Sequence, residues 1–251
     1  MKIRILFMII GIFIGAYVGG FFTSQTVNIY YYNYSSQLAC SRPVNFSSNL
    51  SFASISVPAV DQEGNGVATI LDVQVVPGSG KTLANVDTLL FWTDTQNSIR
   101  TAKAVAEQVI NTSLDNYDII YTISANASVI EGPSAGAALT IATIAAIGNK
   151  PLNGSVMITG TINHDGTIGP VGGIVEKAIA AKSIGAELLL VPLSQSMQVT
   201  YEPKRYCEKI GFSQICTVEQ IPSKVDVSEQ SGIQVKEVKN VEDALKYFLI
   251  Q

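Results

Sequence analysis

The sequence predicts an α+β fold behind one apolar N-terminal segment, from the pattern of its apolar residues and from its composition. Short apolar runs typical of strands are mixed with helical stripes, without the regular alternation of a doubly wound α/β protein. Of the 251 residues, 47% are apolar and only 14% are charged, which excludes a disordered chain. The formal net charge is −4, so the basic surface that nucleic acid requires is absent, and we expect no nucleic-acid partner.

The N-terminal segment is expected to cross a membrane. Its uncharged run, Ile5 to Phe22, reads ILFMIIGIFIGAYVGGFF. At ~1.5 Å per residue such a run spans a hydrocarbon core of ~30 Å. Lys2 and Arg4 precede it and the next basic residue is Arg42, which places the N-terminus in the cytoplasm. A cleaved signal peptide is the alternative, but residues 21–25 are a poor cleavage site. We therefore expect residues 1–22 to be a single-pass cell-membrane anchor.

Residues 23–51 are rich in Ser, Asn and Tyr, lack a helical period and are interpreted as a stalk, with the domain beyond it outside the cell. Asn-x-Ser/Thr glycosylation motifs give mild support for that location. They begin at Asn33, Asn45, Asn49, Asn111, Asn126 and Asn153. Cys207 and Cys216, nine positions apart around Gly211, either form a disulfide in an oxidising compartment, which leaves Cys40 over, or are unrelated thiols.

The first half of the remaining domain, which we place at 52–251, is expected to hold three strands and one helix. Residues 54–60 and 67–76 are apolar strands, joined by a polar, glycine-containing turn. A further strand is predicted at 119–123. Before it, residues 97–110 form a helix whose apolar stripe consists of Ile99, Ala102, Val105, Ala106 and Val109.

The second half of the domain alternates helices with strands. Helices are predicted at 134–147, 174–184 and 241–249 and strands at 156–162 and 187–191; Gly185 and Pro192 follow two of them as stop signals. The stretch 201–235 has no clear pattern and is interpreted as an inserted flap.

One loop resembles a phosphate-binding loop without completing it. The run from Pro77 to Thr82 follows a strand and contains Gly80-Lys81-Thr82. A P-loop requires a glycine five residues before its Gly-Lys, and Val75 occupies that position. A strand-end turn is the better interpretation, so no cofactor is predicted; ATP binding stays a hypothesis that nucleotide affinity would test.

Ser134 has the surroundings of a nucleophile. Pro133 suits the first turn of a helix, which places Ser134 at the helix N-terminus, where the dipole favours negative charge. Gly132 and Gly136 allow a substrate backbone to come close. An ordinary N-cap serine is the structural alternative.

Lys177 supports catalysis. On the helix 174–184 its same-face neighbours are Ile174, Ala180, Ala181 and Ile184, all apolar. Burial lowers the pKa of a lysine, and a neutral amine can take the proton of a serine. The structural alternative is a lysine whose end reaches water. The chain has a single histidine, His164, so conventional bases are nearly absent.

The segments 131–136, 156–162 and 169–181 together resemble the proteolytic domain of Lon proteases, peptidase family S16, in its archaeal Lon-like form. The spacing of 43 positions between Ser134 and Lys177 agrees, and the resemblance covers roughly residues 52–251. It implies the α+β Lon proteolytic fold and a serine endopeptidase with a Ser134–Lys177 dyad. Thr159 falls on a threonine that orients the lysine, and Glu131 replaces the usual aspartate near the site. No metal is implied.

The resemblance also implies a polypeptide substrate and a homo-oligomer, commonly a hexameric ring. Family members usually carry an AAA+ ATPase module before this domain, whereas this sequence has the anchor and stalk there. Substrates would then be peptides or unfolded segments, unless a separate ATPase partner delivers them. The second hypothesis is a non-catalytic Lon-fold oligomerisation module at the membrane.

Overall fold

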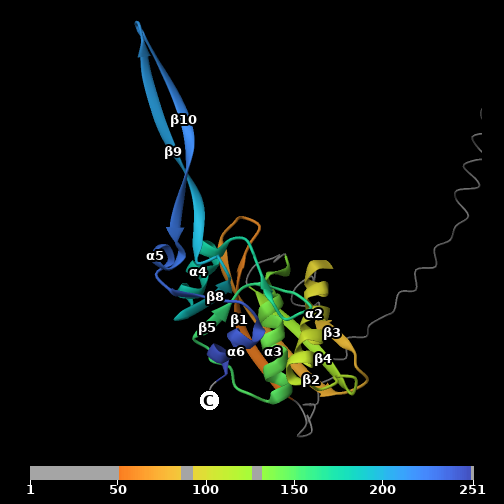
Figure 1. Ribbon diagram of the computed structural model, residues 1–251. Helices are drawn as coiled ribbons and strands as arrows, with labels where there is room; N and C mark the ends of the chain where they lie inside the picture. Colours follow the sequence, from red (N-terminus) through yellow and green to blue (C-terminus); the bar gives the residue numbers. More distant parts are fainter. Residues whose placement is uncertain (1–50, 86–92, 126–131, 250–251) are drawn as a thin grey trace, which may run out of the picture. The chain divides into compact units, whose positions relative to one another are not determined.

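The computed structural model of the chain describes residues 51–85, 93–125 and 132–249 (Figure 1). The predicted anchor, the stalk up to residue 50, Cys40 and Glu131 lie outside these residues. Within the described segments, no helix combines the length and the apolar character needed to cross a bilayer.

A four-stranded sheet forms the first half of the fold. It contains β1 (Ser51–Val60), β2 (Gly66–Pro77), β3 (Thr82–Asn85) and β4 (Tyr117–Ala125), in the order β1-β2-β4-β3. Only the β3–β4 pair is parallel. Because side chains alternate along a strand, β1 and β2 bury one face, and this confirms the predicted hairpin.

Two helices cover that buried face. They are α2 (Thr93–Ile110) and α3 (Gly136–Gly148), which pack on each other, and α3 also contacts β1 and β2. Helix α2 confirms the predicted helix but begins four residues earlier. The α3 residues from Gly136 to Ala146 are buried all round, as expected of an Ala-rich helix inside a core.

The second half is built on a three-stranded parallel sheet. Its order is β11-β8-β5, with β5 (Val156–Ile158), β8 (Leu188–Pro192) and β11 (Gln234–Val238). The helices are α4 (Ile174–Ser183), α5 (Val227–Ser231) and α6 (Val241–Phe248). Helix α6 begins where the Asn240 side chain accepts a hydrogen bond from the Asp243 N–H at 2.9 Å.

The strand predicted at 156–162 is interrupted. After β5 the chain leaves the parallel sheet, and β6 (Thr161–Ile162) pairs instead with β7 (Ile168–Gly169). At the break, the Gly160 N–H donates to the carbonyl oxygen of Ser134 at 2.9 Å, so this contact draws the chain toward the start of α3. The interruption thus joins the two halves of the fold beside Ser134.

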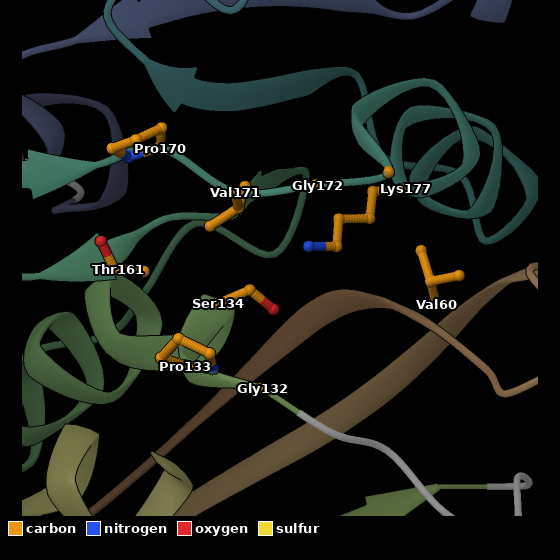
Figure 2. A pocket seen from close by; sticks show the side chains of 10 residues that line it. Val60, Gly132, Pro133, Ser134, Thr161, Pro170, Val171, Gly172 and Lys177 are labelled. Carbon is orange, nitrogen blue, oxygen red and sulfur yellow. The ribbon is translucent and has the colours of Figure 1, made fainter.

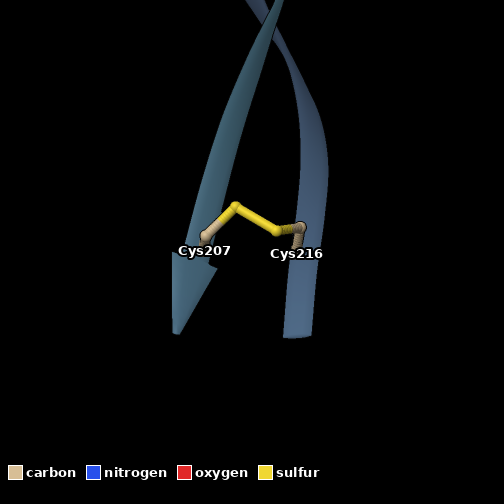
Figure 3. The surroundings of a disulfide bond; sticks show 2 residues. All are labelled: Cys207 and Cys216. Atoms are coloured by element: carbon tan, nitrogen blue, oxygen red, sulfur yellow. A yellow bond between two sulfur atoms is a disulfide. The ribbon is translucent and has the colours of Figure 1, made fainter. Parts of the chain in front are cut away.

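The predicted flap at 201–235 has different bounds. A long antiparallel hairpin of β9 (Met197–Ile210) and β10 (Ser213–Asp226) accounts for most of it, while α5 and β11 belong to the second half of the fold (Figure 1). Within the hairpin, Cys207 and Cys216 are directly opposite each other and form a disulfide (Figure 3). The pairing considered from the sequence is therefore present.

Candidate active site

Ser134 lies at the entrance of the buried helix α3. It is the middle residue of a short 3₁₀ turn, Pro133–Ala135, that leads directly into α3, and Pro133 opens this turn as predicted. Before it, Gly132 has φ of +102°, which side-chain-bearing residues rarely adopt. The serine is only partly buried, so its hydroxyl can meet a ligand while its backbone is held by the helix.

Lys177 lies in the first two turns of α4 and is almost completely buried, with 4% of its surface exposed. Burial lowers the pKa of the Lys177 amine from 10.5 to about 8, and the neighbouring charge of Glu176 opposes the shift. In the described segments, no carboxylate forms an ion pair with this amine. Its predicted neighbours Ile174, Ala180 and Ala181 are buried, but Ile184 is 51% exposed because α4 ends before it.

The two side chains line one pocket of about 450 Å³. Figure 2 shows two polar groups pointing into this space from opposite sides. The hydroxyl of Ser134 comes from the start of α3, and the amine of Lys177 comes from α4. The remaining lining residues are mostly apolar or glycine: Val60, Gly132, Pro133, Thr161, Pro170, Val171, Gly172 and Gly173. The pocket therefore combines a hydroxyl, a weakly basic buried amine and apolar walls.

Thr159 stands behind the serine and does not line the pocket. It is completely buried; its N–H donates to the Leu190 carbonyl at 3.1 Å, and its hydroxyl lies 3.5 Å from the carbonyl oxygen of Ser134. The hydrogen-bond partner of this hydroxyl is thus the backbone of the serine, whereas the family resemblance implies that the hydroxyl orients the lysine. Through its contact with the Ser134 carbonyl, Thr159 couples the end of β5 to the start of α3.

Gly136 has a different role from the one expected. A Cβ at this position would lie 2.7 Å from Cγ2 and 2.8 Å from the backbone nitrogen of Ile162, so the glycine lets α3 approach β6. It is not among the residues that line the pocket. Of the two glycines that frame Ser134, only Gly132 lines the pocket, and a Cβ there would meet nothing within 4 Å.

Gln195 holds a wall of the pocket, and no sequence pattern indicated this role. Its side-chain oxygen accepts the N–H of Val171 at 3.0 Å, and its side-chain nitrogen donates to the Val171 carbonyl at 2.7 Å. This pair of bonds mimics a strand partner for the loop from Pro170 to Gly173. The loop ends at Gly173, whose φ of +66° starts α4 and thus sets the position of Lys177.

Other groups considered from the sequence lie apart from this pocket. His164 is exposed in the turn between β6 and β7. Around the phosphate-loop-like turn, the carboxylate of Asp118 accepts the N–H groups of Ser79 and Lys81, each at 2.8 Å. These donors lower the pKa of Asp118. The backbone N–H groups that would contact a phosphate in a P-loop thus bind the carboxylate of Asp118 here, which agrees with a strand-end turn.

Comparison with known proteins identifies the class to which this fold and pocket belong. Residues 70–227 match the family model of the Lon protease (S16) C-terminal proteolytic domain, and the chain is a member of this family. It is 27% identical over 181 residues to the Lon protease of Escherichia coli strain K12, covering 70% of this chain and 23% of that protein. It is 23% identical over 192 residues to the archaeal Lon protease of Thermococcus kodakarensis, covering 76% and 30%.

A third relative is the Lon protease of Buchnera aphidicola, 32% identical over 107 residues, which are 43% of this chain and 14% of that protein. The chain spans less than a third of the length of each of these curated relatives. The family membership confirms the resemblance on which the sequence interpretation rests, and the mixed architecture of strands and helices is consistent with it.

Proposed function

We propose that this chain is a serine endopeptidase in which Ser134 is the nucleophile and Lys177 is the general base. The observation that carries the proposal is the buried amine of Lys177, which faces the same pocket as the Ser134 hydroxyl and has no carboxylate partner among the described residues. With its pKa at about 8, roughly a tenth of this amine is neutral at pH 7. A neutral amine is the form that accepts a proton.

In the first step, the Lys177 amine takes the hydroxyl proton of Ser134 while the serine oxygen attacks the carbonyl carbon of the peptide. The C–N bond then breaks, and the Lys177 ammonium gives its proton to the leaving amine. The acyl-enzyme is hydrolysed by water, which Lys177 deprotonates in its turn, and the proton returns to the serine oxygen. The start of α3, with its helix dipole, stabilises the oxyanion.

Polypeptides are the proposed substrates, because the relatives are Lon proteases and the walls of the pocket are apolar. The sequence favours unfolded proteins or peptides as substrates, which reach the site directly or are delivered by a separate ATPase. It also supports a single-pass anchor at residues 1–22 and a peptidase domain on the extracytoplasmic side. The anchor and the extracytoplasmic position of the domain are proposed from the sequence alone.

The dyad is tested by substitution of each member in the full-length chain. We expect Ser134→Ala and Lys177→Met to abolish cleavage of unfolded casein and to prevent labelling by a fluorophosphonate probe, with the circular dichroism spectrum unchanged. The matched controls are Ser79→Ala and Lys182→Met, which alter exposed residues outside the pocket and should keep full activity. Cleavage by a double Ser134→Ala, Lys177→Met variant at the normal rate would refute the dyad.

The same probe distinguishes the alternative function. A folded, oligomeric protein that neither cleaves casein nor reacts with the fluorophosphonate would be a non-catalytic assembly module. A membrane-impermeant version of the probe, applied to intact cells, tests the orientation: labelling of Ser134 only after lysis would contradict an extracytoplasmic domain.

A further inference from the structure

The hairpin of β9 and β10, residues 197–226, lacks a covering layer over its outer part. Every residue from Tyr201 to Ile215 is exposed. A two-stranded ribbon with no third strand or helix over it buries little apolar surface, so it is marginally stable by itself. Several of its apolar side chains are nevertheless more than half exposed: Tyr201, Ile210, Phe212, Ile215 and Val218. These features indicate a surface that is covered by a partner.

The strand register divides the hairpin into two faces, because directly opposite residues of an antiparallel pair share a face. What we call the basic face has three cations against one carboxylate. Its members are Met197, Val199, Tyr201, Pro203, Arg205, Cys207 and Lys209 with their partners Asp226, Lys224, Pro222, Gln220, Val218, Cys216 and Gln214. The one carboxylate, Asp226, is engaged in capping α5, where it accepts the Ser228 N–H at 2.7 Å.

The opposite, acidic face has three carboxylates against one cation. Its members are Gln198, Thr200, Glu202, Lys204, Tyr206, Glu208 and Ile210 with their partners Val225, Ser223, Ile221, Glu219, Thr217, Ile215 and Ser213. The cation, Lys204, lies 5.5 Å from the ring centroid of Tyr206. The outer half of this face is hollowed by about 390 Å³, and the hollow is lined by Tyr206, Glu208, Ile210, Ile215, Thr217 and Glu219.

In the part of the chain that the structure describes, the charges on the outer half of both faces form no ion pair. Among the described residues the ion pair is between Lys246 and Asp243, far along the sequence from the hairpin. Arg205 and Lys209 on one face, and Glu208 and Glu219 on the other, are therefore open to an external partner. The acidic hollow is complementary to a partner surface that is both apolar and basic. The basic face has that composition, since Val218 lies directly opposite Arg205.

We propose that this hairpin docks on the hairpin of a second copy of the chain, with the basic face of one copy against the acidic face of the next. The two contact surfaces differ, so each copy uses one face for each neighbour. Such a heterologous contact generates a closed ring or an open array. The proposal does not depend on the peptidase activity, and it assigns the homo-oligomer implied by the family to a particular surface of this chain.

A membrane surface is a poorer partner for the two faces of the hairpin than a second copy of the chain. Anionic lipid would attract the basic face, but it would repel the carboxylates of the acidic face and leave the apolar hollow uncovered. Further copies of the chain cover both faces, one neighbour on each, through the same pair of surfaces. We therefore commit to the second copy, and lipid binding becomes a contrary outcome of the test.

The first experiment exchanges charges on the full-length chain in mild detergent and measures its mass by sedimentation velocity. The basic-face variant is Arg205→Glu with Lys209→Glu, and the acidic-face variant is Glu208→Lys with Glu219→Lys. Each alone brings like charges together, so we expect its dissociation constant to rise about tenfold or more at ~0.15 M salt. A one-to-one mixture should restore the assembly, because the altered faces complement each other. Lys182→Glu with Lys236→Glu, exposed and outside the hairpin, is the matched control.

A second measurement keeps the proposal testable if other surfaces also hold the copies together. Protein with normal nitrogen is mixed with nitrogen-15 protein and treated with a carbodiimide, which joins neighbouring amines and carboxylates. We expect cross-links between peptides of different isotope, from Lys209 or Lys224 to Glu208 or Glu219. Cross-links confined to single copies, or a mixture of variants that fails to reassemble, would overturn the proposal. So would unchanged mass in variants that lose binding to vesicles of anionic lipid.

Discussion

Lys177 makes the fold less stable at neutral pH than the same fold would be with an apolar side chain. Its pKa is about 8 in the folded chain against 10.5 for an exposed lysine, so the unfolded state binds the proton more tightly. A group that binds its proton more weakly in the folded state makes the fold less stable as the pH falls. The free energy of unfolding is therefore highest above pH 10.5 and decreases as the pH falls from there through about 8. The lost stability amounts to about 3 kcal/mol below that window.

We therefore predict that Lys177→Met raises the free energy of unfolding at pH 7 by about 2–3 kcal/mol, since it removes the cost of burying an ammonium. Urea denaturation at pH 7 and at pH 10.5 measures the effect, which should vanish at the higher pH. Lys182→Met, one turn further along α4 and exposed, should change neither value. Destabilisation of equal size at both pH values would mean that the amine is not buried.

If Lys177 is the base, as proposed, the same pKa sets the pH dependence of the reaction. Because only the neutral amine takes the serine proton, kcat/KM for a peptide should rise about tenfold per pH unit below pH 8 and level off above it. Initial rates from pH 6 to pH 10 give the profile. If the midpoint of the pH profile were near 10.5, the amine would be exposed to water and Lys177 would not be the base.

At the scale of elements, the sequence predicted the strands and helices whose apolar pattern is strict. The alternation in β1 and β2 and the stripe on α2 each report burial on one side, which is a local property. The break at Thr159 and Gly160 has no such pattern: it arises because the Gly160 N–H bonds to the distant carbonyl of Ser134. The β9–β10 hairpin escaped prediction because both of its outer faces are exposed and apolar residues lie on each.

Gln195 gives a prediction at the same scale. Gln195→Ala removes both hydrogen bonds that hold the Val171 backbone, so the loop that starts α4 loses its position. Loss of two such bonds, at about 1 kcal/mol each, should lower kcat/KM roughly tenfold to thirtyfold. A positioning residue should leave the midpoint of the pH profile near 8, unlike a change in the burial of Lys177.

The control for that prediction is Gln234→Ala, an exposed glutamine on β11 that should keep full activity. Gln195→Glu retains the acceptor for the Val171 N–H but turns an oxygen toward the Val171 carbonyl, so it should recover only part of the loss. Full activity of Gln195→Ala would show that the loop keeps its position without the side chain.

At the scale of the whole molecule, the two proposed catalytic residues belong to different hydrophobic cores. Helix α3, behind Ser134, packs in the larger core with β1, β2 and α2, whereas α4, which carries Lys177, packs in a second core with β8 and α5. Sequence motifs could identify both residues, since each lies in its own glycine-framed segment. They could not reveal Val60, which lines the pocket from β1, or Gln195, which holds the pocket residue Val171 from the loop after β8.

The meeting of the two cores depends on Gly66, which gives the last prediction. Gly66 is paired with the pocket residue Val60, and a Cβ at its position would overlap the backbone carbonyl of Glu176, next to Lys177. Gly66→Ala should therefore displace α4 from β2 and separate the amine from Ser134. We expect kcat/KM to fall at least tenfold while overpacking costs about 1–3 kcal/mol of unfolding free energy.

Gly154→Ala is the matched control, because a Cβ there meets nothing within 4 Å. Peptide cleavage and urea denaturation of both variants separate a local shift from general destabilisation. If the two alanine variants cleaved at equal rates, α4 would have room to yield, and the close packing of β2 against α4 would not be what sets the distance between hydroxyl and amine. A selective loss in Gly66→Ala would instead mean that the contact between the two cores aligns the catalytic pair.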